Sequence, residues 1–233
     1  MKRAIIVLSS WMVLAGLGSP ALAGEIRGQI LITRTLTKKR VSVPTYYLRG
    51  IALAADAPSK EPVDEMGRTA VYLEGPAAIP PVPPPPVKRT LTQKNRRFDP
   101  EMMIVPAGST VSFPNGDPIF HNVFSLSSAS QFDLGNYPAG ETRLVKLDKA
   151  GVVQVYCHLH SEMNAAIVVT PTGWYAKPTA DGGFDFMDLP AGDYTVVAWH
   201  KSAGFFRKRI RVPEAGAVDV SMTIPIVGES AAQ

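Results

Sequence analysis

Apolar and polar residues alternate in short runs along most of the chain, and glycine or proline separates one run from the next. Alternation with a period of two is typical of extended strands, whereas a helix shows apolar residues at spacings of three and four. The pattern therefore predicts an all-β protein. Residues 51–67 have weak periodicity and are expected to form a loop, with a helical turn as an option. The predicted strands span residues 25–32, 69–73, 102–105, 109–113, 122–125, 142–147, 152–157, 165–170, 184–187, 194–199, 206–212 and 217–224.

A proline-rich run divides the chain. Residues 75–87 contain seven prolines, four of them consecutive. Such a run cannot donate the hydrogen bonds of a sheet and favours an extended polyproline II spacer. The expected division is an N-terminal set of strands at 24–80, a linker at 81–87, a compact sandwich at 88–170, a second β pattern at 171–228 and a disordered tail at 229–233.

The first 23 residues have the features of an export signal. Lys2 and Arg3 form a charged start, an apolar run follows at 4–17, and residues 21–23 form a small-residue cleavage site. The apolar run is too short for a membrane-spanning helix. We expect cleavage after Ala23, a mature chain without a membrane span, and a location in the bacterial periplasm.

The charge balance says little about the kind of partner that the protein binds. The chain has 24 basic and 20 acidic residues, and removal of the signal leaves 22 against 20, a formal charge of +2. This balance gives no indication of nucleic-acid binding. The basic runs at 38–40 and 207–209 are expected to be solvated; the less favoured alternative is that they dock an acidic redox partner.

The chemistry of the chain is concentrated in residues 155–163, which hold its single cysteine. Cys157, His160 and Met163 follow the spacing C-x2-H-x2-M. Side chains alternate along the predicted strand, so the sulfur of Cys157 is expected on the apolar inner face. His121, at the start of another strand, is the natural donor of a second imidazole. Two imidazoles, a thiolate and a weak axial thioether are the ligands of a blue-copper electron-transfer site.

Each of these side chains has a plainer interpretation when taken alone. A lone exported cysteine can be a buried structural residue, and a lone methionine often fills a gap in a core. The combination favours a metal site. Asn122 is expected to hydrogen-bond across to the backbone of residues 157–158 and tie the two ligand segments together. His158 is expected to point to solvent; if it competed for the metal, the site would shift toward a tetragonal copper or a zinc centre.

Further residues extend this pattern. They are Phe98-Asp99-Pro100, Val105, Gly108, Val111, Phe113, Asn115, His121-Asn122, Gly151, Tyr156-Cys157, His160 and Met163. Through them, residues 88–170 resemble the cupredoxin (plastocyanin-like) family, and the short ligand loop is similar to that of amicyanin. The resemblance implies a Greek-key β-sandwich, one copper ion and His160 as the ligand whose edge passes electrons. The whole chain is also similar to periplasmic methylamine-utilization or plastocyanin-like proteins, although none of its residues shows methylamine chemistry.

The C-terminal part carries a second resemblance. Residues 181–184 and 189–196 are similar to turns and strands of the carboxypeptidase-regulatory-like (transthyretin-like) β-sandwich. The first strands of that fold resemble residues 24–30 and 70–73, which precede the cupredoxin-like part. We therefore expect a discontinuous second sandwich into which the cupredoxin-like part is inserted. The alternative is that residues 24–80 add strands to the cupredoxin-like part. The default role is recognition or scaffolding, because a fold alone assigns no function.

These observations predict a periplasmic type 1 copper protein that transfers single electrons between redox partner proteins. A different class remains open, a module that binds or delivers copper without redox cycling. An enzyme is not expected, because catalytic copper needs an open coordination position.

Overall fold

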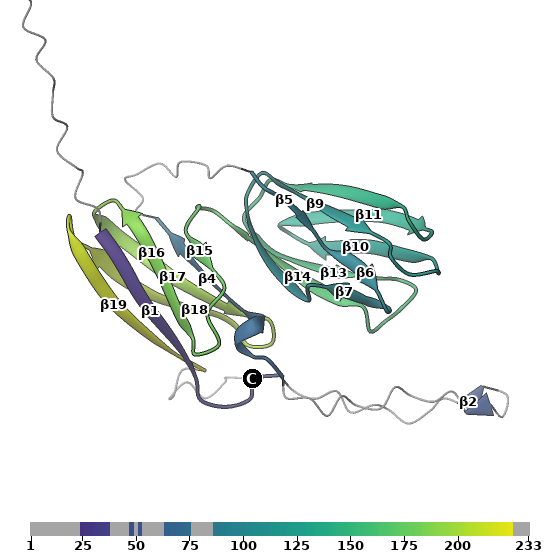
Figure 1. The fold of residues 1–233 in the computed structure, drawn as a ribbon, viewed down its shortest axis with the longest axis horizontal. Helices are drawn as coiled ribbons and strands as arrows, with labels where there is room; N and C mark the ends of the chain where they lie inside the picture. The colour runs from purple at the N-terminus through teal and green to yellow at the C-terminus, as the bar shows by residue number, and fades with distance from the viewer. Residues whose placement is uncertain (1–23, 38–46, 49–50, 53–62, 76–85, 226–233) are drawn as a thin grey trace, which may run out of the picture.

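The computed structural model describes residues 24–37, 47–48, 51–52, 63–75 and 86–225, and they form β-strands almost throughout (Figure 1). The all-β prediction is confirmed. Among these residues, the 3-10 helix Met66–Arg68 is the only helix, and no helix is long and apolar enough to span a bilayer. The strands are β1 (Gly24–Ile32), β2 (Tyr47–Leu48), β3 (Ile51–Ala52), β4 (Thr69–Glu74), β5 (Lys88–Thr90), β6 (Thr92–Lys94), β7 (Arg97–Asp99), β8 (Met102–Pro106), β9 (Ser109–Pro114), β10 (His121–Ser127), β11 (Ser130–Tyr137), β12 (Thr142–Leu147), β13 (Gly151–Tyr156), β14 (Asn164–Thr170), β15 (Tyr175–Ala176), β16 (Gly183–Leu189), β17 (Gly192–His200), β18 (Gly204–Val212) and β19 (Gly216–Ile224).

All twelve predicted strands are present, and the sequence pattern missed others. β11 was missed because turn-forming residues interrupt it: Asp133, Gly135 and Asn136 lie inside a paired strand. In the expected loop at 51–67, the structure has the short strand β3 and the 3-10 helix. The predicted export signal, the tail and most of the linker lie outside the described residues.

One sandwich is built from residues 88–170. Its larger sheet has the order β11-β10-β13-β14-β8, and the facing sheet has the order β12-β9-β5. Val111 and Phe113 of β9 share a buried cluster with Val153 and Val155 of β13. The alternation of these residues with polar ones along each strand directs one face of each sheet into this common core.

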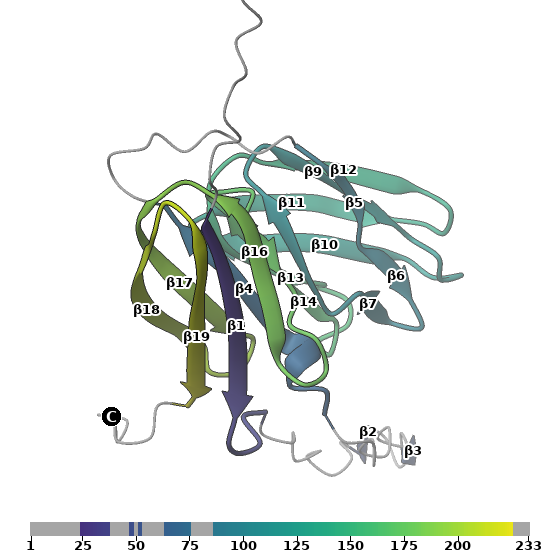
Figure 2. The same cartoon turned by 60° about the vertical axis from the view of Figure 1, so that its left-hand side comes forward.

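The second sandwich is assembled from both ends of the chain. β1 pairs with β16 and, in parallel, with β19, while β4 pairs with β17. The two sheets, β16-β1-β19 and β15-β4-β17-β18, stack face to face (Figures 1 and 2). Their shared core includes Ile26, Val71, Phe186 and Val196. β1 and β4 thus add to this sandwich rather than to the one at 88–170.

The two sandwiches pack against each other through β4 and β14, which lie side by side in both views (Figures 1 and 2). Tyr72 and Trp199 of one sandwich share a buried cluster with Met102 and Val168 of the other. At the rim of this contact, Glu101 accepts hydrogen bonds from Arg68 and from Lys201. β14 follows the predicted ligand loop directly, so the second sandwich contacts the strand on which that loop ends.

Candidate metal centre

Strand pairing brings the two predicted ligand segments to the same end of the larger sheet. β10 and β13 are antiparallel neighbours, with Phe124 opposite Tyr156. His121 is the first residue of β10 and Cys157 follows the last residue of β13, so both lie at the same end of the sheet. The chain then turns through residues 158–163 and re-enters the sheet as β14. The N–H of Met163 donates to the carbonyl of His160 at 3.0 Å, which closes this turn.

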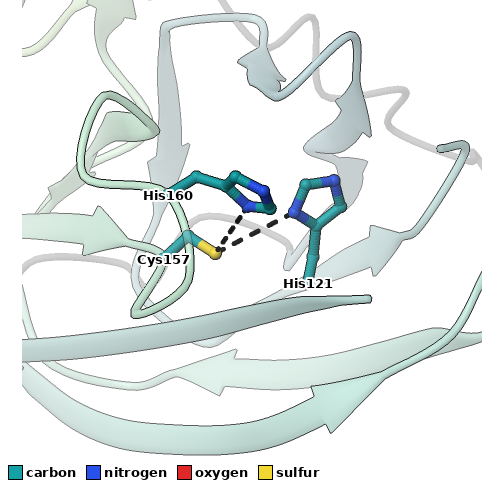
Figure 3. A group of neighbouring side chains, drawn as sticks. All are labelled: His121, Cys157 and His160. Atoms are coloured by element: carbon teal, nitrogen blue, oxygen red, sulfur yellow. Dashed lines mark hydrogen bonds between the residues drawn. The ribbon is translucent and has the colours of Figure 1, made fainter. Parts of the chain in front are cut away.

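His121, Cys157 and His160 converge on one point (Figure 3). The Sγ atom of Cys157 lies 3.9 Å from Nδ1 of His121 and 3.8 Å from Nδ1 of His160. One ligand atom from each of the three residues lies within 4.8 Å of the others. The two imidazole rings are 4.8 Å apart between centroids and meet edge to face. A His-Cys-His group is therefore present.

The spacing of these atoms suits a bound metal ion. An ion about 2.1 Å from an imidazole nitrogen and about 2.3 Å from a thiolate separates the two atoms by roughly 3.8 Å at an angle of about 120°. Both sulfur–nitrogen distances have this value within 0.1 Å. A soft thiolate with two imidazoles is the donor set of copper or zinc sites. The sulfur–nitrogen distances thus match those of a thiolate and an imidazole that share one ion.

The three residues of the group are largely shielded from solvent. His121 is fully buried and Cys157 is 5% exposed, while His160 is half-buried. Burial lowers the pKa of His160, and the neighbouring His121 and Arg96 lower it further. A lowered pKa keeps this imidazole neutral, and a neutral imidazole is the form that can bind a metal.

Asn122 connects the two ligand segments. Its backbone N–H donates to Sγ of Cys157 at 3.5 Å, and its side-chain oxygen accepts the backbone N–H of His158 at 3.4 Å. Its amide group donates to Asp133 at 2.7 Å. The hydrogen bond that the sequence predicts between Asn122 and the backbone of residues 157–158 is thus present, with the His158 N–H as its donor. Such bonds hold a ligand in a fixed orientation.

His158 lies outside the group. Its side chain is 54% exposed and its Nε2 atom is 3.6 Å from Asp133. Its ring stacks on Phe124 with centroids 3.8 Å apart and planes 2° from parallel. This stacking places His158 on the outer face of the sheet, while the neighbouring Cys157 points inward.

Met163 and His200 lie in different sandwiches. Met163 is 1% exposed and belongs to the same buried cluster as Cys157; its part as a fourth ligand remains a prediction. His200 lies in the other sandwich, where its Nε2 atom is 3.0 Å from Glu65. This histidine therefore lies apart from the group.

The sequence pattern missed the partner of His121. Nε2 of His121 is 2.8 Å from Oδ2 of Asp117, whose side chain is 8% exposed. Asp117 is followed by Pro118, and such a pair is typical of a turn. The signal that could have identified Asp117 in the sequence is its position four residues before His121, a candidate ligand.

No protein-family model matches the sequence, and no curated protein matches it. Solved structures similar to part of it include a purple cupredoxin from Nitrosopumilus maritimus, with 19% identity over 35% of this chain and 98% of that one, at a TM-score of 0.32. A reduced amicyanin mutant shares 18% identity over 35% of this chain and 80% of its own, at a TM-score of 0.33. A copper-containing nitrite reductase from Thermus scotoductus SA-01 shares 24% sequence identity over 41% of this chain and 25% of its own, at a TM-score of 0.34. Scores and identities at this level assign neither a ligand nor an activity to this chain.

Proposed function

We propose that this protein carries single electrons through one type 1 copper ion, held by His121, Cys157 and His160 with Met163 as a weak axial ligand. The observation that carries the proposal is the convergence of one sulfur and two Nδ1 atoms at separations of 3.8 and 3.9 Å. Copper bound there would supply the Cu(II)/Cu(I) couple, which a thiolate and two imidazoles can hold in both oxidation states.

The chain supplies a rigid and largely buried frame for this couple. His121 begins a strand and Cys157 ends one, and Asn122 links the two by hydrogen bonds. Ligands held by strands and by each other move little when the charge of the site changes. This rigidity suits electron transfer better than substrate turnover, which requires an open coordination position.

His160 is the proposed point of electron entry and exit. It is the most exposed of the three residues that form the group. Three apolar side chains next to the candidate ligands in sequence are also exposed: Ile119 at 40% and Phe120 at 57% precede His121, and Leu159 at 48% precedes His160. Exposed apolar residues of this kind commonly mark a protein interface. We propose a redox partner protein docked over them, and the features of residues 1–23 support a periplasmic location.

The visible spectrum of copper-loaded protein tests the proposal. We expect an intense blue or green band from thiolate-to-copper charge transfer, which dithionite bleaches and reoxidation restores. The variant Cys157→Ser should bind copper weakly and lack the band. A colourless, redox-silent copper complex of the wild-type protein would refute the proposal.

The alternative is a module that delivers copper without cycling it. Its support is the same soft donor set, which also binds Cu(I). The kinetics of Cu(I) transfer to a copper-free acceptor protein discriminate between the two. A carrier of electrons should release the ion slowly, because its ligands lie on strands; rapid and complete transfer would favour delivery.

A further inference from the structure

The carboxylate of Asp117 is the acceptor of a small buried hydrogen-bond cluster beside the metal-binding group. Oδ1 accepts the backbone N–H of Asn95 at 2.6 Å, and Oδ2 accepts that of Arg96 at 2.8 Å. Oδ2 also lies 2.8 Å from Nε2 of His121. Each carboxylate oxygen thus accepts a backbone N–H, so the His121 ring meets a group that already acts as an acceptor.

The acceptor role of the carboxylate fixes the proton of the histidine ring. Both carboxylate oxygens accept backbone N–H groups, and this arrangement places the hydrogen of the contact with His121 on Nε2. In the neutral imidazole the other nitrogen, Nδ1, then carries a lone pair. Nδ1 is the atom that faces Sγ of Cys157 at 3.9 Å. The carboxylate therefore determines which ring atom is free to bind a metal ion.

The carboxylate is itself held by the tip of a hairpin. β6 and β7 pair with Lys94 opposite Arg97, so Asn95 and Arg96 form a two-residue turn. Both residues have φ of 54°, the left-handed conformation that a tight hairpin turn requires at its two central positions. A residue other than glycine adopts this conformation at a cost of about 1 kcal/mol or more. The turn directs both of its N–H groups at Asp117, and these hydrogen bonds offset part of that cost.

A second loop holds Asp117 from the other side. The backbone N–H of Asp117 donates to Oδ1 of Asn115 at 3.0 Å. The amide group of Asn115 donates to the carbonyls of Ile119 at 2.8 Å and of Tyr137 at 3.1 Å. Tyr137 is paired with His121 across the sheet. The carboxylate is thus fixed relative to the strand that carries the histidine.

We propose that Asp117 is a positioning residue, which accepts the Nε2–H of His121 and so presents the unprotonated Nδ1 of that ring to the metal ion. The hairpin at 92–99 acts through it by holding the carboxylate in place. The inference rests on the proposed function for the identity of the ion, copper. The assignment of the ring proton holds for the metal-free protein as well.

The chain offers a matched control. Glu65 and His200 form a second carboxylate–imidazole pair, also through Nε2, at 3.0 Å. There, Nδ1 accepts the backbone N–H of Ser202 at 3.1 Å. Glu65→Gln thus changes a similar pair in the other sandwich and leaves the metal-binding group untouched.

The decisive variant is Asp117→Asn, which keeps the size of the side chain. A carboxamide has one acceptor oxygen and cannot serve donors on both of its atoms. With its NH2 group toward His121, it favours a proton on Nδ1, the atom needed by the metal. We expect copper affinity, measured by competition with a chelator, to fall about 10- to 100-fold. Glu65→Gln should leave the affinity unchanged.

The second readout is free of metal. Long-range 1H–15N spectra of the metal-free wild-type protein should show His121 protonated on Nε2 alone. In Asp117→Asn, part or all of the proton should move to Nδ1. Wild-type copper affinity and an unchanged ring proton in Asp117→Asn would overturn the proposal, and so would an equal loss of affinity in Glu65→Gln.

If the amide spectrum shows that Asp117→Asn does not fold, the ring proton of the wild-type protein still tests the proposal. In that case a wild-type His121 protonated on Nδ1 overturns the proposal, and one protonated on Nε2 supports it. The ring proton also separates this inference from the proposed function. A protein that is redox-silent with copper but carries the Nε2 proton refutes electron transfer and leaves the role of Asp117 intact.

Discussion

Two buried histidines, one in each sandwich, are held by a carboxylate in nearly the same way. Nε2 of His121 meets Asp117 at 2.8 Å, and Nε2 of His200 meets Glu65 at 3.0 Å. Both rings are fully buried. They differ in what the other nitrogen faces. Nδ1 of His200 accepts a backbone N–H from Ser202, whereas Nδ1 of His121 faces the sulfur of Cys157.

The difference shows that the same kind of carboxylate–histidine pair can have two roles. At His200 every polar atom of the ring has a partner within the fold, so the pair stabilises the structure. At His121 one nitrogen is directed at a thiol and a second imidazole, a combination that the fold itself does not need. In the proposed function, the neighbours of its second nitrogen make His121 a metal ligand, whereas His200 has no such neighbours among the described residues.

Replacement of each histidine by alanine should separate the two roles, and this is the largest effect we expect. His121→Ala removes a ligand and should lower copper affinity by more than about 100-fold, beyond the loss typical of a hydrogen-bond partner of a ligand. His200→Ala should keep copper affinity and lower the free energy of unfolding by about 1–3 kcal/mol, because Glu65 loses a buried partner. Chelator competition and urea unfolding measure the two quantities. Equal copper affinity in both variants would break the comparison.

The pH dependence of stability should sharpen the structural role of the second pair. Burial would raise the pKa of Glu65, but hydrogen bonds from Thr37 and Leu36 outweigh burial and lower the pKa. A carboxyl group with a lowered pKa in the folded state stabilises the protein above its ordinary pKa, and this contribution is lost as the pH falls through the folded-state value.

We therefore expect Glu65→Gln to be less stable than the wild type by about 1–2 kcal/mol at pH 7. The difference should begin to shrink below the ordinary pKa of 4.5 and vanish below the lower folded-state value, where the wild-type carboxyl group is also neutral. Urea unfolding midpoints of both proteins at pH 7, 5 and 4 test this. A difference that stays constant or grows toward acid would contradict the assignment.

The smallest effect is expected at the histidine beside Cys157. His158 stacks on Phe124 and is 54% exposed, so His158→Ala should change the position of the copper absorption band little and copper affinity by less than about threefold, well under the loss typical of a residue that holds a ligand. A large shift of the band would show that this ring joins the site.

The sequence predicted the all-β class and the grouping of His121, Cys157 and His160, because both follow from local signals. Strand periodicity is a property of neighbouring residues, and Cys157 and His160 are separated by two positions. His121 could be placed because it opens an apolar strand. The types and spacing of these residues indicated the ligand set, and the resemblance to the cupredoxin family agreed with it.

Asp117 could not be predicted, because its role depends on contacts between distant segments. Its carboxylate is held by Asn95 and Arg96, more than twenty residues earlier, and the three-residue strands that form this hairpin have almost no alternating pattern. β11 was missed for a related reason: residues such as Asn136 favour turns in isolation, and here Asn136 pairs with Asn122 of β10.

X-ray absorption at the copper edge of the loaded protein tests the central claim most directly, since it reports the atoms around the ion. We predict one copper per chain with one short sulfur ligand and two imidazole nitrogens, and loss of the sulfur in Cys157→Ser. A first shell made of nitrogen and oxygen alone in the wild-type protein would contradict the account.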